Sequence, residues 1–134
     1  MSNGSLTIVG LGPGSAGYLS VETQRALQNA EKIILRTAMH PTVTELETQQ
    51  IHFVSCDNFY EEGRTFEEVY VKIVDHVLAE AKSSKVVYAV PGSPLVAERT
   101  VVLLREACST QGLKLEILPA MSFLDLAYVK LNLD

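Results

Sequence analysis

The sequence predicts an α/β fold built on a five-stranded, mainly parallel sheet that is flanked by helices. Short runs of aliphatic and β-branched residues alternate with amphipathic stretches along the chain, an order typical of parallel sheets. Residues 86–90 show no polar alternation, as expected for a strand buried on both faces. Loops rich in glycine and proline follow the runs at 6–9 and 86–90, and α/β sheets bind ligands at such loops.

The start of the chain predicts two strands with a helix between them. Residues 6–9 form the first aliphatic run, and a second run at 32–35 predicts the next strand. Apolar spacing predicts a helix over 20–29, with Val21 and Leu27 directed inward. The glycine-rich loop therefore falls at the carboxyl end of the first strand.

The next segment predicts a short helix, a strand and a loop. Pro41 suits the first turn of a helix over 42–48. The aliphatic and aromatic residues at 51–55 predict a third strand, and the polar residues at 57–64 predict a loop.

The longest helix is predicted over 66–81, where apolar residues recur at helical spacing from Phe66 onward. Thr65 precedes it as a candidate N-cap, and Glu68 would complete a capping box. The charged residues fall on the opposite side of the same helix. The helix is therefore expected to pack one face against the sheet.

The rest of the chain continues the alternation. A strand over 86–90 precedes a helix over 97–110, which Gly112 is expected to terminate. A last strand is predicted over 115–118 and a last helix over 122–131.

Composition and charge narrow the class of protein. A chain of 134 residues with 47% hydrophobic residues is expected to form one domain. The net charge of −5 and the lack of a lysine or arginine cluster argue against a nucleic-acid partner. No apolar run reaches the roughly 18 to 20 residues that span a bilayer, and the first residues do not resemble a signal peptide.

The cysteines and histidines do not predict a metal site. Cys56 and Cys108 lack the spacing of a metal-binding pair and are expected to be reduced thiols in a cytoplasmic protein. The three histidines also lack metal-ligand spacing. His52 and His76 are expected to be solvated surface residues. We therefore expect no metal.

The glycine loop at residues 10–15 admits a dinucleotide site as an alternative, but two residues weaken it. Pro13 removes a backbone N–H that would face a pyrophosphate. Arg36 ends the second strand, where a nicotinamide dinucleotide site needs an acid. A phosphate-binding P-loop is not supported, because no Gly-Lys-Ser/Thr follows the loop.

The polar residues do not form a recognisable catalytic set, so the catalytic residues stay unassigned. Ser93 has no evident base beside it. Chemistry that depends on positioning fits this composition better than acid–base chemistry does. Methyl transfer from a sulfonium is such a reaction, because its donor is already activated and the enzyme mainly aligns donor and acceptor.

Three motifs together resemble the tetrapyrrole (corrin/porphyrin) methylase family. They are Gly10-Leu11-Gly12-Pro13-Gly14-Ser15, Gly92-Ser93-Pro94 and Pro119-Ala120-Met121-Ser122-Phe123. Each follows a predicted strand, in the order that the family shows. The resemblance covers the family's N-terminal half, residues 1–134, and implies that a second α/β domain, which helps to close over the cofactor, is absent from this chain.

Further stretches resemble one bacterial branch of that family. They are Leu35-Arg36-Thr37 with His40-Pro41, the segment 60–70 and the segment 87–100. In that branch the methylase-like domain is fused to a C-terminal MazG-type nucleoside triphosphate pyrophosphohydrolase. The resemblance therefore implies a bifunctional polypeptide whose C-terminal domains are partners of this one.

The resemblance implies that S-adenosyl-L-methionine is the cofactor and that three groups of residues contact it. The first loop would border the cofactor, the second would cradle its methionine and sugar portions, and the third would flank its adenosine. These residues are, in order, Leu11, Pro13 and Gly14; Gly92, Ser93 and Val96; and Met121, Ser122 and Phe123.

Departures from the family pattern leave two functions open. Ser15 and Ser93 stand where the family has acids, and Ala120 stands where it usually has glycine. The first function is a methyltransferase whose acceptor is an unidentified small molecule such as a tetrapyrrole. The alternative is a non-catalytic module that regulates or scaffolds the fused pyrophosphohydrolase. Because the second domain is absent, this half alone is expected to bind the cofactor weakly, to transfer no methyl group and to self-associate through Leu95, Val96 and Phe123.

Overall fold

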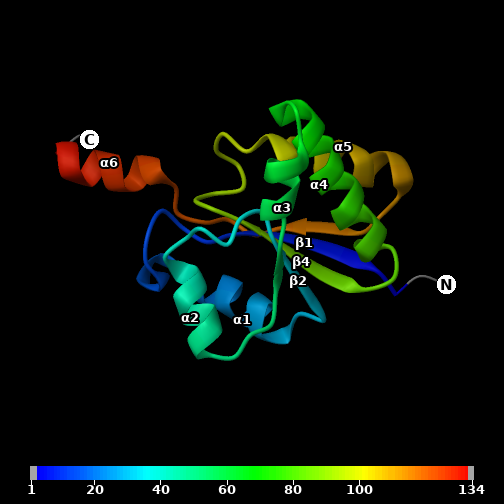
Figure 1. The fold of residues 1–134 in the computed structure, drawn as a ribbon. Helices are drawn as coiled ribbons and strands as arrows, with labels where there is room; N and C mark the ends of the chain where they lie inside the picture. Colours follow the sequence, from blue (N-terminus) through cyan, green and yellow to red (C-terminus); the bar gives the residue numbers. More distant parts are fainter. Residues whose placement is uncertain (1–2, 133–134) are drawn as a thin grey trace.

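The computed structural model describes residues 3–132 and contains one five-stranded sheet in which every strand pairing is parallel. The strand order is β3-β2-β4-β1-β5, as Figure 1 shows for its centre. The strands are β1 (Ser5–Gly10), β2 (Lys32–Leu35), β3 (Val54–Ser55), β4 (Lys85–Val90) and β5 (Leu115–Ile117). The predicted fold class is therefore confirmed.

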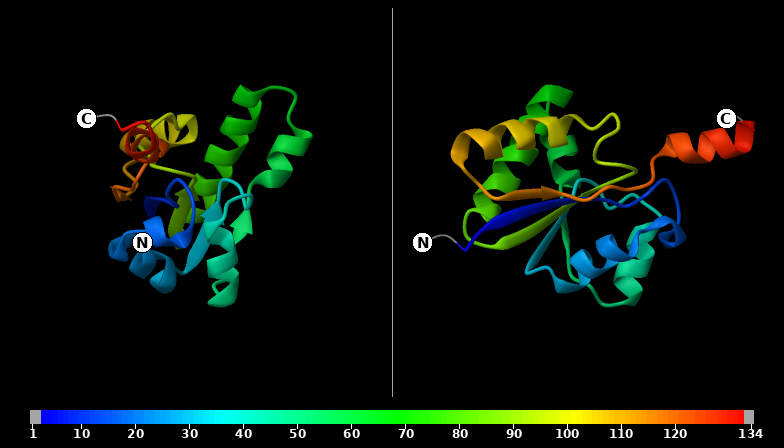
Figure 2. Two further views of the ribbon diagram at one scale, coloured as in Figure 1. Left: turned by 90° about the vertical axis from the view of Figure 1, so that its left-hand side faces the viewer. Right: turned by 180° about the vertical axis from the view of Figure 1, so that it is seen from behind.

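Helices cover both faces of the sheet (Figures 1 and 2). α1 and α2 pack on one face, α3, α4 and α5 pack on the other, and α6 extends away from the sheet. The helices are α1 (Val21–Asn29), α2 (Thr42–Thr48), α3 (Asp57–Glu62), α4 (Phe66–Ala81), α5 (Arg99–Gln111) and α6 (Phe123–Leu131), with a short 3₁₀ turn η1 (Ala16–Tyr18) after β1.

Alternating side chains of the strands divide the core into two halves. In β4, Val86, Tyr88 and Val90 join the cluster under α4 and α5, whereas Val87 and Ala89 join the cluster over α1 and α2. Successive side chains of a strand point to opposite faces, so a strand covered on both sides has to be apolar at every position. This explains the continuous apolar run of β4.

Caps that the sequence predicts fix several helix ends. The Ser20 side chain accepts a hydrogen bond from the Thr23 amide at 3.0 Å and begins α1. The Thr65 side chain accepts one from the Glu68 amide at 3.2 Å and begins α4, although only this half of the expected capping box is present. Gly112 ends α5 with a φ of 67°, a conformation that glycine adopts without a steric penalty.

The predicted loop over 57–64 is wrong, because residues 57–62 form α3. Asp57 lies in the first turn of this helix, where a carboxylate is favoured by the helix dipole. Phe59 and Tyr60 pack against the core cluster beneath α4. A six-residue helix of mostly polar residues is stabilised by such tertiary contacts rather than by its own apolar period.

Several element boundaries also differ from those predicted, most of them by one residue, and the largest differences are at β3 and at the start of α5. Only Val54 and Ser55 of the predicted third strand pair with β2. The helix predicted from residue 97 begins at Arg99, because Ala97 has a φ of 54° and lies outside the right-handed helical region. The predicted strand over 115–118 ends at Ile117.

Two side chains that were expected to pack inward are exposed. Val21 is 60% exposed at the first position of α1, and Phe66 is 71% exposed at the first position of α4. First-turn side chains extend beyond the part of a helix that faces the sheet. Phe66 instead stacks on the Tyr70 ring at 6.3 Å between centroids.

The histidines and cysteines can now be placed. His52 is exposed, whereas His76 is half-buried, with its ring 5.7 Å from the Phe59 ring. Cys56 and Cys108 are both buried free thiols. Within residues 3–132, no helix is long and apolar enough to cross a membrane, and no three metal-ligating side chains cluster together.

Candidate functional site

The carboxyl ends of β1, β2, β4 and β5 enclose a pocket of about 340 Å³. Parallel strands end at the same edge of a sheet, so the loops that follow them lie together. The three motif loops therefore converge at one site, as their order along the chain predicts. The lining residues are Gly12, Pro13, Arg36, His40, Pro41, Pro91, Gly92, Ser93, Val96, Ala97, Glu98, Ser122 and Phe123.

A backbone bridge joins the first two loops at the floor of the pocket. The Gly12 amide donates to the Gly92 carbonyl at 3.1 Å, and the Gly92 amide donates to the Gly12 carbonyl at 2.9 Å. Both glycines have a positive φ, 77° for Gly12 and 66° for Gly92, a conformation that residues other than glycine rarely adopt. A Cβ atom on the neighbouring Gly10 would overlap the Gly92 carbonyl oxygen and come within 2.7 Å of the Ala120 Cβ.

The start of α2 holds the first loop from the other side. Thr42 is fully buried, and its hydroxyl lies 3.2 Å from the carbonyl oxygens of both Leu11 and Gly14. The His40 Nδ1 atom accepts a hydrogen bond from the Thr42 amide at 3.1 Å. The His40 Nε2 atom therefore carries the proton and donates to the Gly12 carbonyl at 2.8 Å.

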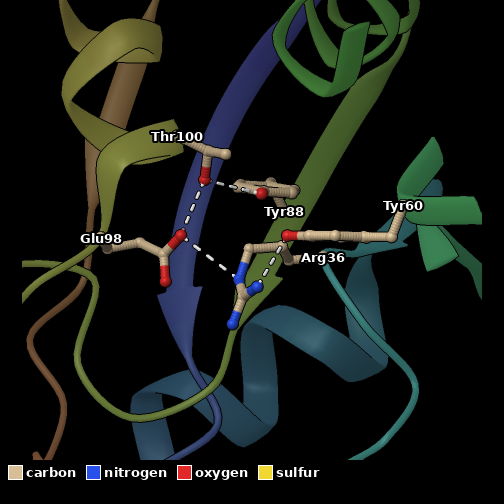
Figure 3. A network of polar contacts seen from close by, with 5 residues as sticks. All are labelled: Arg36, Tyr60, Tyr88, Glu98 and Thr100. Carbon is tan, nitrogen blue, oxygen red and sulfur yellow. Dashed lines mark hydrogen bonds and ion pairs between the residues drawn. The ribbon is translucent and has the colours of Figure 1, made fainter. Parts of the chain in front are cut away.

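A polar network reaches one wall of the pocket through Arg36 and Glu98, the two of its five residues that line the pocket (Figure 3). Arg36 donates from Nη1 to the Tyr60 hydroxyl at 2.8 Å, and its Nε atom lies 3.3 Å from Oε1 of Glu98. The Thr100 hydroxyl donates to the same carboxylate oxygen at 2.9 Å and accepts from the buried Tyr88 hydroxyl at 2.8 Å. The network thus ties β2, α3, β4 and the start of α5 together.

The Arg36–Glu98 contact is an ion pair without a well-aligned hydrogen bond. Arg36 Nε is a buried polar atom for which the described residues supply no hydrogen-bond partner, although Oε1 of Glu98 lies at ion-pair distance. The 3.3 Å separation puts the two charges in ion-pair contact, but Nε makes no hydrogen bond of acceptable geometry. The pair is therefore held mainly by charge and by its outer partners, Tyr60 and Thr100.

Burial and nearby charges shift the pKa values of Glu98 in this network and of the nearby Cys56. Burial raises the pKa of Glu98, and the Arg36 charge and the Thr100 hydrogen bond offset only part of that rise. Burial also raises the pKa of the Cys56 thiol, to about 12, with the Asp57 charge adding to the effect. A thiol with this pKa stays protonated at neutral pH and is a poor nucleophile.

Asp57 connects α3 to the loop after β2. Its Oδ2 atom accepts a hydrogen bond from the Ala38 amide at 2.9 Å. Burial raises the pKa of this carboxyl, but hydrogen bonds from Thr37, Ala38 and Ser55 and the Arg36 charge more than offset it, so the pKa is lowered overall. The carboxylate therefore stabilises the loop that carries Arg36 and His40.

Six of the nine residues predicted to contact the cofactor line the pocket, and three do not. Those in the lining are Pro13, Gly92, Ser93, Val96, Ser122 and Phe123. Leu11 is fully buried in the core, Gly14 lies behind the lining with its carbonyl facing Thr42, and Met121 is 39% exposed outside it.

The two serines in the lining differ in what they can still bond. The Ser93 hydroxyl accepts from the Leu95 amide at 3.2 Å, which leaves its own proton free to donate. The Ser122 hydroxyl and amide are both engaged in the capping box that begins α6 with Asp125. Ser93 is therefore available to a ligand as a donor, whereas Ser122 mainly shapes the third loop.

Arg36, His40 and Glu98 also line the pocket, although the three motifs do not predict them as contacts of the cofactor. No local motif marks them, since Arg36 and Glu98 come from segments far apart in the chain. The branch resemblance does contain all three residues, because it is carried by Leu35-Arg36-Thr37 with His40-Pro41 and by residues 87–100. Such a resemblance indicates a relationship between proteins and does not by itself identify which residues line a pocket.

Known proteins resemble this chain over nearly its whole length. Residues 5–134 match the family Tetrapyrrole (Corrin/Porphyrin) Methylases. Uncharacterized protein YabN of Bacillus subtilis (strain 168) is 37% identical over 131 residues, which cover 98% of this chain and 27% of YabN. The methyltransferase and cyclic peptide lentinulin A precursor ledMA of Lentinula edodes is 27% identical over 133 residues, covering 98% of this chain and 32% of that protein.

Solved structures show the same fold. Uroporphyrin-III-C-methyltransferase from Thermus thermophilus superposes with a TM-score of 0.66 and 22% identity, covering 89% of this chain and 48% of that one. A diphthine synthase gives a TM-score of 0.63 and 23% identity, covering 87% of this chain and 44% of that one. Another structure of the Thermus enzyme, complexed with S-adenyl homocysteine, gives a TM-score of 0.62 and 24% identity, covering 90% of this chain and 50% of that one.

The chain spans about a third or less of the curated relatives' length and about half of the solved chains. The family match covers nearly all of the present sequence. The parallel sheet and the three loops that meet at its carboxyl edge agree with the same assignment. This chain belongs to the tetrapyrrole (corrin/porphyrin) methylase family.

Proposed function

We propose that this chain forms the cofactor-binding half of an S-adenosyl-L-methionine-dependent methyltransferase. The observation that carries the proposal is the pocket in which the loops after β1, β4 and β5 meet, with Gly12 and Gly92 bridged at its floor. The bridge fixes the spacing of two loops before any ligand arrives. Such fixed spacing is what methyl transfer needs, because the reaction depends on the alignment of donor and acceptor.

Three features of the pocket lining support a site for this cofactor. A Cβ atom on Gly92 would have no neighbour within 4 Å, so the backbone there is open to an approaching ligand. Ser93 retains a free donor, and Phe123, at 58% exposed, offers an aromatic surface on which a flat base can stack. When bound, S-adenosylmethionine supplies a methyl group on a positively charged sulfur.

Within this proposal, the role of each of the nine predicted contact residues follows from its position relative to the pocket lining. Residues of the lining would contact the cofactor directly. The remaining three would act from behind the lining or from the rim. The two sets are Pro13, Gly92, Ser93, Val96, Ser122 and Phe123, and then Leu11, Gly14 and Met121.

The proposal includes a small-molecule methyl acceptor, with a tetrapyrrole as one candidate, and C-terminal domains of a MazG-type pyrophosphohydrolase on the same polypeptide. The branch resemblance supports the fusion, and the chain covers only 27% of YabN. The exposed side chains of Leu95 and Phe123 support a homo-oligomer. The buried free thiols support a cytoplasmic location.

A non-catalytic module is the second candidate, and one observation favours it. The pocket lining contains a single carboxylate among the described residues, Glu98, and Arg36 already neutralises it. Ser93 stands where the family has an acid, so this position offers the cationic donor no negative charge. A charge-assisted contact contributes roughly 1 to 2 kcal/mol more than a neutral one.

Two matched glycine variants test cofactor binding. Gly92 and Gly112 have φ values of 66° and 67°, and a Cβ atom on either would meet nothing within 4 Å. Gly92→Ala and Gly112→Ala should therefore lose similar stability, about 1 to 2 kcal/mol. Only Gly92 lines the pocket, so only Gly92→Ala should weaken the binding of S-adenosylhomocysteine.

Nuclear magnetic resonance titration with S-adenosylhomocysteine gives the readout. We expect weak binding that shifts the amide signals of Gly12, Gly92 and Phe123, with loss of those shifts in Gly92→Ala and retention in Gly112→Ala. Absence of shifts at millimolar ligand would reject the cofactor site and favour the non-catalytic module. Equal loss in both variants would show that backbone strain, and not the pocket, governs binding.

A further inference from the structure

The Arg36–Glu98 pair presents two unused polar atoms to the pocket. The other polar atoms of the pair already have contacts. Nη1 of Arg36 donates to the Tyr60 hydroxyl, and Nε of Arg36 lies at ion-pair distance from Oε1 of Glu98. The same Oε1 atom accepts a hydrogen bond from Thr100. In Figure 3, Oε2 of Glu98 and Nη2 of Arg36 carry no dashed line, and both point toward the loop that follows β4. That loop lines the pocket together with both residues.

The pair is held rigidly before any ligand arrives. The Glu98 side chain is 10% exposed and the Arg36 side chain 23%. Thr100, which holds Oε1, is itself anchored by the fully buried Tyr88. Tyr60 holds the opposite side of the guanidinium from α3. A fixed donor and a fixed acceptor bind a matching group without a large loss of side-chain entropy.

The exposed pattern is a donor beside an acceptor with no net charge. Nη2 can only donate and a carboxylate oxygen can only accept. A bound carboxylate or phosphate would satisfy Arg36 but would lie against the Glu98 charge. A bound ammonium or amidinium would satisfy Glu98 but would lie against the guanidinium. A neutral group that carries a carbonyl next to an N–H satisfies both atoms.

We propose that the Arg36–Glu98 pair is a specificity-determining subsite that recognises a neutral amide-like group on the ligand of this pocket. The group's carbonyl oxygen accepts from Nη2 of Arg36, and its N–H donates to Oε2 of Glu98. The identification of this ligand with the methyl acceptor rests on the proposed function. The recognition pattern itself rests only on the geometry of the wall.

Three small probes of one shape test the pattern. Acetamide carries a donor beside an acceptor, acetate carries two acceptors and a negative charge, and acetamidinium carries donors and a positive charge. Each is titrated into the full chain while the Arg36 Nε and Gly92 amide signals are followed by nuclear magnetic resonance. We expect acetamide to bind roughly threefold to tenfold more tightly than either ion, because each ion places a group of the same kind against one atom of the pair, an acceptor against Oε2 or a donor against Nη2.

Glu98→Gln should invert this preference. The carbonyl oxygen of the substituted side chain is expected to keep the contacts with Arg36 and Thr100, which turns the new amide nitrogen toward the pocket. Two donors then lie side by side, and acetate should become the tightest-binding probe. Glu67→Gln is the matched control, since Glu67 pairs with Arg99 at 3.5 Å on an exposed surface outside the pocket lining, and it should leave the order of the probes unchanged.

The outcomes separate this subsite from the proposed function. Tightest binding of acetate or acetamidinium to the unmodified chain, or no binding of any probe at the Arg36 signal, overturns the subsite. If Glu98→Gln fails to fold, the order of the three probes on the unmodified chain decides alone. The titration with S-adenosylhomocysteine is followed at Gly12, Gly92 and Phe123 and tests the cofactor site. Its result is independent of the probe titrations, so either proposal can be rejected while the other is retained.

Discussion

The Nε2 atom of His40 lies 2.8 Å from the carbonyl oxygen of Gly12. This contact joins the loop after β2 to the loop after β1 across the pocket. The Gly12 carbonyl also accepts from the Gly92 amide, so one oxygen collects hydrogen bonds from two other loops. The conformation of the first loop is therefore set by its neighbours as much as by its own glycines.

His40→Ala should loosen this loop and weaken ligand binding. The substitution removes one donor from Gly12 and one acceptor from the Thr42 amide, and we expect a loss of about 1 to 2 kcal/mol in the free energy of unfolding. Urea denaturation measures the loss, and titration with S-adenosylhomocysteine measures the binding. His52→Ala, at an exposed position, is the control, and an equal loss there would contradict the assignment.

Thr42→Val tests the hold of α2 on the same loop. The substitution keeps the shape of the side chain but removes the hydroxyl that reaches the Leu11 and Gly14 carbonyls. The position is fully buried, so both carbonyls lose a partner, at a cost of about 1 to 3 kcal/mol. Thr44→Val, on the exposed side of α2, should change stability by less than about 0.5 kcal/mol. Similar values for both variants would refute the prediction.

Gly10→Ala should disrupt the junction of the first two loops. The added methyl group would overlap the Gly92 carbonyl and come within 2.9 Å of the Pro94 Cδ, so the backbone must shift. Overpacking of this kind costs typically about 1 to 3 kcal/mol. At Gly17 the nearest atom to an added Cβ lies at 3.6 Å, and Gly17→Ala should leave the melting temperature unchanged or slightly raised. An unchanged melting temperature for Gly10→Ala would show that the junction is not tightly packed.

Asp57→Asn should lower stability in a pH-dependent way. The pKa of Asp57 is below its ordinary value of 3.8 in the folded chain, so the folded state binds fewer protons than the unfolded state as the pH falls through this range. The stabilisation is fully present above about pH 4 and is lost as the pH falls through the folded pKa. We expect Asp57→Asn to lose about 1 kcal/mol at neutral pH.

The readout for Asp57 is the difference in unfolding free energy between the two proteins at several pH values. The difference should shrink toward zero below the folded pKa. Asp75→Asn, on the exposed side of α4, controls for the general effect of removing a negative charge. A difference that stays constant with pH would show that the Asp57 charge does not stabilise the loop.

Local patterns predicted most of the framework. The strand at 32–35 and the helix at 42–48 have the predicted bounds, because their apolar period and flanking residues act within the segment itself. The caps at Thr65 and Gly112 are confirmed for the same reason. α3 was missed, since its stability comes from Phe59 and Tyr60 packing against the core cluster beneath α4, which no apolar period within residues 57–62 encodes.

The site could be predicted only in part. The glycine loops were recognisable because their motifs are contiguous, and the order of parallel strands places them at one edge. The Arg36–Glu98 wall depends on a contact between β2 and the start of α5, which no period or motif encodes. Ala97, the residue before Glu98, has a φ of 54°. The sequence does not predict this left-handed conformation, because alanine rarely adopts it.

The exposure of α6 divides the molecule into parts of unequal local stability. The helix has no buried residue, and nine residues are too few for a helix to be stable by itself in water. The capping box at Ser122 and Asp125 opposes its fraying, but its unfolding uncovers no core. Its amides should therefore exchange with deuterium long before those of the sheet. Ser122 and Phe123, which line the pocket, thus lie at the junction between a rigid framework and a segment that can unfold while the sheet remains intact.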